Sequence, residues 1–224
     1  MSERSPVLVG SDEAGKGPVL GPMVAAAIRA PTAALPEGID DSKRLSPARR
    51  AEIAATLRES DDVTVGVAFV EPERIDDPET DMNGLTVAAH VEAVAAVAAD
   101  GDSVVTDAGD VDESRFGRRL RRGVADAGAN VSVTSEHRAD ETYVHVGAAS
   151  IVAKVERDAR MERIDTAYES YGPVGSGYPS DSTTREFLRQ YVEETGTLPD
   201  CARTSWSTCD DVLAAASQSS LSEF

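Results

Sequence analysis

Acidic residues follow two short apolar segments, where their carboxylates could bind a hard metal ion. Asp12 and Glu13 come after residues 7–10, and Asp107 comes after residues 103–106. Two carboxylates at the end of a buried strand are costly unless a positive charge lies nearby. Carboxylate oxygens suit Mg²⁺ and Mn²⁺, so the pattern predicts a divalent metal site. A solvated acidic turn is the alternative, because acidic residues are spread along the whole chain.

The sequence of residues 10–18 also nearly matches the phosphate-binding loop of nucleoside triphosphatases, with Gly15 and Lys16 in register. That loop needs a Ser or Thr hydroxyl at the next position to bind Mg²⁺, and this chain has Gly17 there. Two carboxylates would also stand inside the phosphate cradle and repel the phosphates. The triphosphatase interpretation is therefore disfavoured.

The glycines of this segment have a second interpretation, in which a metal lies between the protein and a phosphate. Side chains of adjacent strand residues point to opposite faces, so we expect the chain to bend where Asp12 and Glu13 reach one site. Gly15 and Gly17 permit such a bend. They also let backbone N–H groups approach a ligand closely.

The net charge of −18 is unusual for a protein with an anionic substrate. The 22 basic residues comprise 19 arginines and three lysines, namely Lys16, Lys43 and Lys154. A dispersed acidic surface that is poor in lysine is typical of salt-loving organisms, since the Debye length is only about 3 Å at 1 M salt. The charge therefore does not exclude nucleic acid as a substrate, and each lysine falls inside a candidate motif.

Strands and helices are expected to alternate along the chain. The predicted strands are residues 7–10, 19–28, 63–70, 103–106 and 130–134. The predicted helices are residues 46–59, 87–99, 112–127 and 142–171, with two short ones after a Gly/Pro loop at 172–181. Three hairpin-like strands, then two strands that each follow a helix, predict a mixed α/β sheet. Residues 214–224 are of low complexity, and this end is expected to be frayed.

Six motifs, in order between Val9 and Trp206, resemble ribonuclease HII in its archaeal form. They are Asp12-Glu-Ala-Gly-Lys-Gly-Pro18, Asp41-Ser-Lys43, Asp107-Ala108, His137-Arg-Ala-Asp140 followed by Ala149-Ser-Ile-Val-Ala-Lys-Val155, Gly175-Ser-Gly-Tyr-Pro-Ser-Asp181, and Arg203-Thr-Ser-Trp206. One departure is Ser182-Thr-Thr184, where the family has Pro-Arg-Thr or similar.

The resemblance implies a ribonuclease-H-like α/β fold. Its parts would be a five-stranded mixed sheet, flanking helices and a C-terminal helical extension. We expect a catalytic domain at residues 1–172 and a helical segment at 173–224 packed on it, with the last ten or so residues disordered.

The resemblance also implies an active site made of Asp12, Glu13, Asp107 and Asp140, of which the first three bind metal. Two Mg²⁺ or Mn²⁺ ions would be held there, with Asp12 bridging both. The implied activity is hydrolysis of the RNA strand of RNA–DNA hybrids, leaving 3′-hydroxyl and 5′-phosphate ends. Asp140 has an alternative role as the N-cap of the long helix that begins near residue 142.

The 2′-hydroxyl distinguishes RNA from DNA. The resemblance implies that Gly15, Lys16 and Gly17 read it through backbone groups. It also implies that Tyr178 stacks on the ribose at an RNA–DNA junction, so duplex DNA with single ribonucleotides would be a further substrate, cut on the 5′ side. Simple packing is the alternative role for Tyr178.

Three polar residues are predicted as further substrate contacts. Lys43 is expected to contact phosphate. Ser150 and Lys154 are four residues apart, hence on one helix face. For this pair, phosphate contact and structural support are both open.

Two further groups of residues receive structural interpretations. One helical face carries four arginines, and in so acidic a chain a salt-bridged surface is favoured over a nucleic-acid track: Arg115, Arg118, Arg119 and Arg122. The three histidines lack metal-ligand spacing and are interpreted as structural: His90, His137 and His145.

No secretory signal and no membrane-spanning segment is predicted. We expect a cytoplasmic, monomeric protein with reduced thiols at Cys201 and Cys209. The tail shows no clear peptide motif for a sliding clamp, so that partner cannot be predicted from the sequence. Two other function classes stay open, a different carboxylate–metal phosphohydrolase and a non-catalytic nucleotide-binding module.

Overall fold

A computed structural model of the chain describes residues 6–39 and 45–221. Its contacts divide the chain into two compact units. Of the described residues, the first unit contains 6–14, 23–39, 45–69 and 82–156, and the second contains 15–22, 70–81 and 157–221. Helix α5, Val144–Ala167, contributes its first part to one unit and its second part to the other.

The first unit is built on a five-stranded sheet with the order β3-β2-β1-β4-β5. The strands are β1 Val7–Ala14, β2 Met23–Pro31, β3 Thr64–Val70, β4 Ser103–Asp107 and β5 Ser132–Glu136. β1 pairs with β2 in antiparallel and with β4 in parallel orientation, and β4 pairs with β5 in parallel. The predicted mixed sheet is confirmed.

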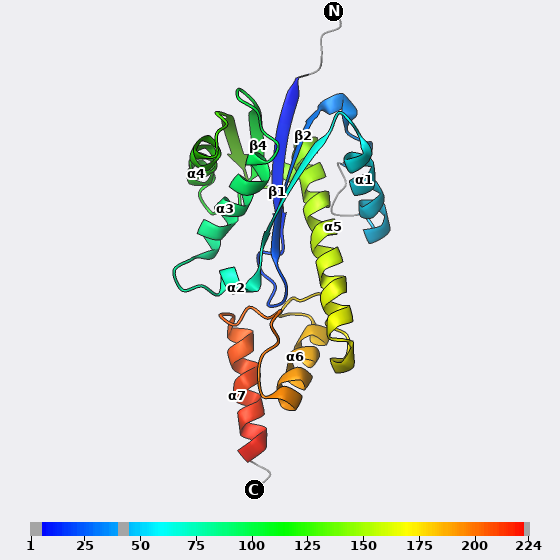
Figure 1. Cartoon of the computed structure of the whole chain (residues 1–224), viewed down its shortest axis with the longest axis vertical. Helices are drawn as coiled ribbons and strands as arrows, with labels where there is room; N and C mark the ends of the chain where they lie inside the picture. The colour runs from blue at the N-terminus through cyan, green and yellow to red at the C-terminus, as the bar shows by residue number, and fades with distance from the viewer. Residues whose placement is uncertain (1–5, 40–44, 222–224) are drawn as a thin grey trace, which may run out of the picture. The chain divides into compact units, whose positions relative to one another are not determined.

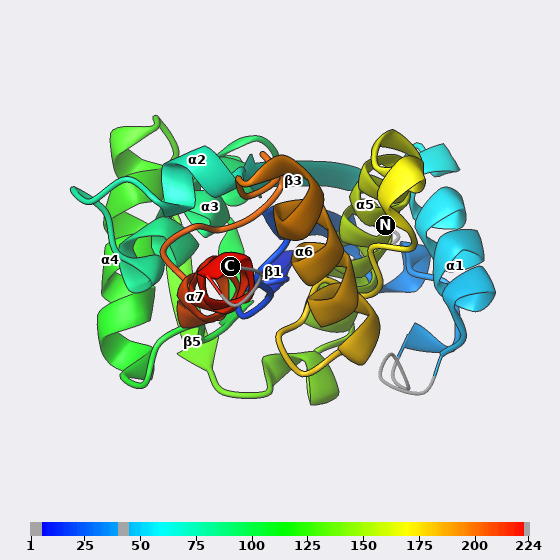
Figure 2. The same ribbon diagram turned by 90° about the horizontal axis from the view of Figure 1, so that it is seen from below.

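Helices cover both faces of this sheet (Figures 1 and 2). α1 and the first part of α5 lie over one face, and α3 and α4 lie over the other. The bounds are α1 Pro47–Glu59, α3 Met82–Ala95 and α4 Glu113–Asp126, with short 3₁₀ turns at Thr32–Ala34 and Ala139–Glu141. Ser46 and Asp112 start α1 and α4 as N-caps, because their side chains accept hydrogen bonds from Arg49 N (3.2 Å) and Arg115 N (2.9 Å).

Small and branched apolar side chains fill the space between the sheet and α1 and α5. β2 contributes alternate residues to this cluster, as expected for a strand whose side chains alternate between faces. The residues involved include Ala26, Ile28 and Ala30 of β2, Ile53 and Leu57 of α1, and Ile151 and Val152 of α5. Ala148 and Ala149 let α5 pack closely there, in keeping with the low aromatic content.

The second unit consists of short helices around its own apolar cluster. Its elements are α2 Pro72–Ile75, the end of α5, a 3₁₀ turn Glu169–Tyr171, α6 Ser182–Thr195 and α7 Ser207–Leu221. The cluster includes Leu20, Met161, Phe187 and Leu188, and the ring of Tyr168 packs edge-on against Phe187 at 5.7 Å. Cys201 and Cys209 are buried free thiols, as expected.

Several boundaries differ from the sequence-based expectation. The second strand begins at Met23, not at residue 19, because Val19 N donates to Gly177 O (2.8 Å) and Leu20 forms a bridge with Ala202. The long helix ends at Ala167. α7 extends to Leu221, past residue 214 where fraying was expected. The division of the chain at residue 172 stays a prediction.

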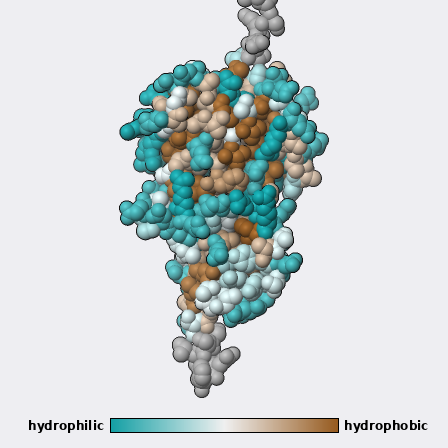
Figure 3. Space-filling model, in the orientation of Figure 1, coloured by the Kyte–Doolittle hydropathy of each residue, from teal (hydrophilic) through white to brown (hydrophobic). Residues whose placement is uncertain are grey.

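Hydrophilic side chains occupy much of the face shown in Figure 3, with apolar patches between them. Within residues 6–39 and 45–221, no helix has the length and apolar character needed to cross a membrane.

Candidate active site

The register of two parallel strands brings Asp12 and Asp107 to the same edge of the sheet. Ser11 of β1 pairs with Thr106 of β4, so the aspartates that follow them are neighbours at the carboxyl ends of these strands. Ligand sites of such sheets lie outside the carboxyl ends of parallel strands. The sheet topology therefore produces the pair that the sequence pattern predicted.

Asp12 is a buried residue that is only 7% exposed. Burial, reinforced by the charges of Glu13 and Asp107, raises its pKa well above the usual value. A hydrogen bond from Ser150 and the charge of Lys154 act in the opposite direction. Lys154 Nζ also donates to Ser150 Oγ (2.6 Å), so these two residues of α5 support Asp12.

Glu13 points to the other face of the sheet, toward α3. The expected bend between the two carboxylates is wrong, because β1 stays extended through Ala14. Asp12 contacts Ser150 of α5, whereas Glu13 Oε2 lies 2.9 Å from Nε2 of His90 on α3. The two carboxylates therefore reach the sheet edge from opposite faces.

His90 is fully buried between three polar side chains. Its Nδ1 lies 2.6 Å from Ser11 Oγ and 3.1 Å from Thr106 Oγ1, both hydroxyls that can donate. The hydrogen-bond network therefore places the ring proton on Nε2, which donates to Glu13. The structural interpretation of His90 missed this contact, because no spacing rule connects a lone histidine to a residue 77 positions away.

Asp107 and Asp140 form the other half of the carboxylate group. Burial raises the pKa of Asp107, and the charges of Asp140 and Glu13 raise it further. The backbone N–H groups of Asp140 and Arg138 donate to Asp107 and partly offset this shift. Arg138 has a left-handed φ of 58°, a costly conformation for a residue with a side chain, which is typical of functional sites.

Asp140 itself is buried in the 3₁₀ turn Ala139–Glu141. α5 begins only at Val144, so the alternative role of Asp140 as an N-cap for that helix is wrong. Its position beside Asp107 is consistent with the active-site role that the resemblance implied.

The four carboxylates are suited to a cation by their chemistry. Charges within the group raise the pKa values of Asp12 and Asp107, and a divalent ion would relieve this repulsion. In the part of the chain that the structure describes, no three His, Cys, Asp or Glu side chains form a ready-made metal cluster. Pairwise charge interactions connect the four carboxylates, because Asp12 interacts with Glu13 and Asp107, and Asp107 interacts with Asp140.

In the second unit, the turn that follows β1 is held by a buried arginine. Arg203 donates to the carbonyl oxygens of Gly15 (2.6 Å), Lys16 (2.9 Å) and Gly21 (2.9 Å). Burial, together with the charge of Arg157, lowers the pKa of Arg203 to about 10. The sequence placed Arg203 in a motif but gave it no role.

Only one of the two glycines expected to permit the turn is required by its geometry. Gly15 has φ +83°, and a Cβ there would lie 2.5 Å from Cδ of Arg157. Gly17 has no positive φ, and a Cβ there would meet nothing within 4 Å. The open space at Gly17 leaves its backbone accessible.

Tyr178 stands on a loop that is fixed by Asp181. Asp181 accepts hydrogen bonds from Ser176 N (2.8 Å), Ser176 Oγ (2.7 Å) and Thr183 N (2.9 Å), and these lower its pKa to about 2. Tyr178 remains 40% exposed, with the Arg157 guanidinium 5.4 Å from its ring centroid. This exposure disfavours a pure packing role for Tyr178.

The model of the family described as "Ribonuclease HII" matches residues 9–209. This chain belongs to the ribonuclease HII family. It is 59% identical over 215 residues to Ribonuclease HII of Halobacterium salinarum, covering 96% of this chain and 98% of that protein. It is 61% identical over 216 residues to the Haloarcula marismortui protein, covering 96% and 99%.

Two solved structures of archaeal relatives have the same fold. The ribonuclease H2 from Pyrococcus horikoshii matches with a TM-score of 0.83 and 33% identity, covering 95% of this chain and 99% of that one. The ribonuclease HII in the PCNA complex from Archaeoglobus fulgidus matches at 0.78 and 36%, covering 89% and 95%. The chain therefore has a ribonuclease-H-like fold and is a metal-dependent nuclease with ribonuclease H activity, and its acidity matches the halophilic archaeal form, as predicted.

The other residues singled out in the sequence differ in how the structure describes them. Lys43 and the rest of its motif lie outside the described residues. Thr184, the residue of the atypical segment that agrees with the family pattern, accepts from Gly177 N (2.9 Å) and donates to Val174 O (3.0 Å), so it supports the loop. His145 is structural, as predicted, with Nε2 3.0 Å from Ala30 O.

Proposed function

We propose that this chain hydrolyses the RNA strand of RNA–DNA hybrids and also cuts on the 5′ side of single ribonucleotides in duplex DNA. The observation that carries the proposal is the pair of buried Asp12 and half-buried Asp107 at adjacent strand ends, with their raised pKa values. Such a pair is unfavourable by itself and becomes favourable around cations.

Asp12, Glu13 and Asp107 would hold two divalent ions, Mg²⁺ or Mn²⁺, and Asp140 would complete the site. When bound, such ions supply an activated water and stabilise the leaving 3′ oxygen, which leaves 3′-hydroxyl and 5′-phosphate ends. The protein orients the ligands. Ser150, supported by Lys154, fixes Asp12 from the α5 side, and His90 fixes Glu13 from the α3 side.

Selection of the ribonucleotide is assigned to the second unit. The turn at Gly15, Lys16 and Gly17 would offer backbone groups to the 2′-hydroxyl. Arg203 stabilises this turn by donating to the carbonyl oxygens of Gly15 and Lys16. Tyr178 would stack on the sugar at the junction, where its exposed ring is available. Of the two roles left open for Ser150 and Lys154, their contacts favour the support of Asp12.

A sliding clamp is proposed as a protein partner. The support is that the Archaeoglobus fulgidus relative is described in a complex with PCNA. Co-elution of this chain with the clamp of a halophilic archaeon in molar KCl would test the partnership.

One assay tests the central proposal. A labelled RNA–DNA hybrid and a labelled DNA duplex with one ribonucleotide are incubated with Mg²⁺, with Mn²⁺ or with chelator, at molar KCl. We expect cleavage of both substrates with metal only, a cut 5′ to the single ribonucleotide, and 3′-hydroxyl and 5′-phosphate ends by mass spectrometry. Cleavage of the hybrid alone would limit the function to hybrids, and cleavage in chelator would remove the metal mechanism.

A further inference from the structure

Helix α4 carries a net positive charge in a chain that is strongly acidic overall. This helix carries five arginines and only two acidic residues, Glu113 and Asp126, within a chain of net charge −18. A salt-bridged surface was expected here, and it accounts for only part of the set. Arg115 is paired with Asp110 (2.6 Å) and Arg122 lies 3.8 Å from Asp126. Among the described residues, Arg118 and Arg121 are exposed and have no ion pair.

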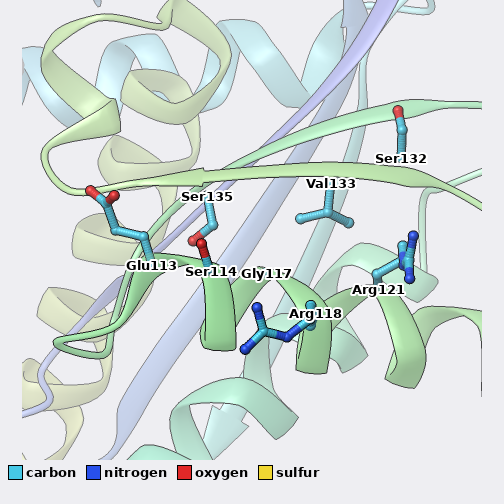
Figure 4. A pocket seen from close by; sticks show the side chains of 8 residues that line it. All are labelled: Glu113, Ser114, Gly117, Arg118, Arg121, Ser132, Val133 and Ser135. Atoms are coloured by element: carbon cyan, nitrogen blue, oxygen red, sulfur yellow. The ribbon is translucent and has the colours of Figure 1, made fainter.

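These two arginines line a groove between α4 and the edge strand β5. The groove has a volume of about 530 Å³, and the side chains that line it are shown in Figure 4. They are Glu113, Ser114, Arg118, Arg121, Ser132, Val133 and Ser135, with Gly117 between α4 and β5. A Cβ at Gly117 would lie 3.1 Å from Cβ of Ser135, so this glycine allows the helix and the strand to approach closely.

The polar groups of the groove favour an anion. Ser135 lines the groove, and its Oγ is buried and, within the described part of the chain, has no hydrogen-bond partner. An unsatisfied buried hydroxyl is costly, and a ligand oxygen would satisfy it. The one carboxylate at the rim, Glu113, is already engaged, because its Oε1 accepts from His137 N (2.7 Å). Guanidinium groups bind phosphate oxygens in a bidentate manner and are weakly hydrated, which suits them to high salt.

We infer that this groove binds backbone phosphates of a nucleic-acid duplex. The inference rests on the proposed function, since it assigns a second contact surface to the same substrate. β5 is parallel to β4, and Glu136 at its end pairs with Asp107, so the groove extends from the carboxylate end of the sheet along α4. Ser114 and Arg121 are seven residues apart, about 10 Å along a helix, which matches roughly three phosphates of one duplex strand.

The test compares two double variants of the same helix. Arg118→Gln with Arg121→Gln removes the groove cations. Arg119→Gln with Arg122→Gln removes the same charge from the side of α4 that faces α3, where both residues line a different hollow. Binding of a 24-base-pair RNA–DNA hybrid is measured by fluorescence anisotropy in chelator over a series of KCl concentrations. Thermal melts establish that both variants are folded.

We expect the groove variant to bind about tenfold more weakly at the lowest salt. Its slope of log affinity against log salt should be smaller by about 2, one for each lost phosphate contact. The control variant should keep a slope close to that of the unmodified chain. Equal changes in both variants, or no change in the groove variant, would overturn the inference and leave the face to a protein partner or to no ligand.

Binding in chelator is independent of the chemical step. Cleavage with Mg²⁺ at sub-saturating hybrid is measured in parallel, and the groove variant should lose rate in proportion to its weaker binding. If the unmodified chain binds the hybrid but does not cut it, the proposed function fails while the groove can still be tested.

Discussion

Aspartates in the two units have opposite surroundings. Asp181 in the second unit accepts three hydrogen bonds shorter than 3 Å, and its pKa falls to about 2. Asp12 and Asp107 in the first unit are more deeply buried and face other carboxylates, and their pKa values rise. The charge of Asp181 thus stabilises a loop, whereas the charges of Asp12 and Asp107 oppose folding until a cation binds. Perturbed carboxylates of this second kind mark functional sites.

The largest expected loss of activity comes from removing one charge of the pair Asp12 and Asp107. Asp107→Asn should lower cleavage by about 10³-fold or more, because the metal contributes several kcal/mol of charge stabilisation and each 1.4 kcal/mol is tenfold in rate. The metal-free variant should melt at a higher temperature than the unmodified chain, since a repulsive buried charge is gone. Rates with Mg²⁺ and melts in chelator test both statements. Substantial residual turnover would move the metal site elsewhere.

A smaller loss is expected from the residue that orients Glu13. His90→Asn removes the donor to Glu13, whereas His90→Gln places an amide N–H near the position of Nε2. Loss of such a supporting hydrogen bond typically costs 10- to 100-fold in metal affinity. We therefore expect weaker Mg²⁺ binding by calorimetry for the Asn variant and near-normal binding for the Gln variant. The same ranking should appear in the rise of Tm on adding Mg²⁺, and equal binding by both variants would make His90 a packing residue.

Tyr178, on the loop fixed by Asp181, allows a test of how a single ribonucleotide is recognised. Tyr178→Ala should reduce cleavage at a single ribonucleotide by about tenfold more than cleavage of a long hybrid, where neighbouring registers offer alternative binding. A lost stacking contact is worth about 1–3 kcal/mol. Tyr178→Phe keeps the ring and serves as the matched control. Equal losses on both substrates would leave Tyr178 with a packing role.

The two kinds of aspartate should also give opposite pH dependences in the metal-free protein. The folded pKa values of Asp12 and Asp107 are raised above the usual 3.8, so the stability linked to their protonated forms is present at low pH and lost as pH rises through the raised values. Asp181 contributes stability above pH 3.8 that is lost as pH falls through about 2. Melts in chelator should therefore show greatest stability at mildly acidic pH. In a plot of Tm against pH, Asp12→Asn should reduce the decrease in Tm on the alkaline side of the maximum. Asp181→Ala should reduce the decrease on the acid side. The stability linked to Asp12 is contradicted if Asp12→Asn leaves the decrease in Tm on the alkaline side unchanged.

The strand-end carboxylates were predictable because local signals identify them. An apolar run that ends in Asp or Glu predicts both the strand and the position of the carboxylates near its end, and the structure has Asp12 and Asp107 there. Asp140 had no such signal, since its local pattern favoured a helix cap. Its neighbour Asp107 is 33 positions away, so only the family motif pointed to the site.

Contacts between distant segments account for most of what the sequence left open. His90 lies in an Ala- and Val-rich helix that predicts burial but not its partner Glu13, 77 residues earlier. Val19 and Leu20 have the composition of a strand, yet they belong to the second unit through Gly177 and Ala202. In the case of Val19 and Leu20, tertiary contacts override the local propensity.

The bonds from Arg203 to the turn at Gly15 and Gly21 have a consequence for how the protein is made. Up to 188 residues separate the guanidinium from the carbonyl oxygens that it binds, so the turn leaves the ribosome long before its partner exists. Closing so long a loop is slow, and domains generally begin to fold from the N-terminal side during synthesis. The first unit has all its segments by residue 156, whereas the second needs residues near both ends of the chain. A chain truncated before Arg203 should therefore carry the carboxylate site without an ordered glycine turn.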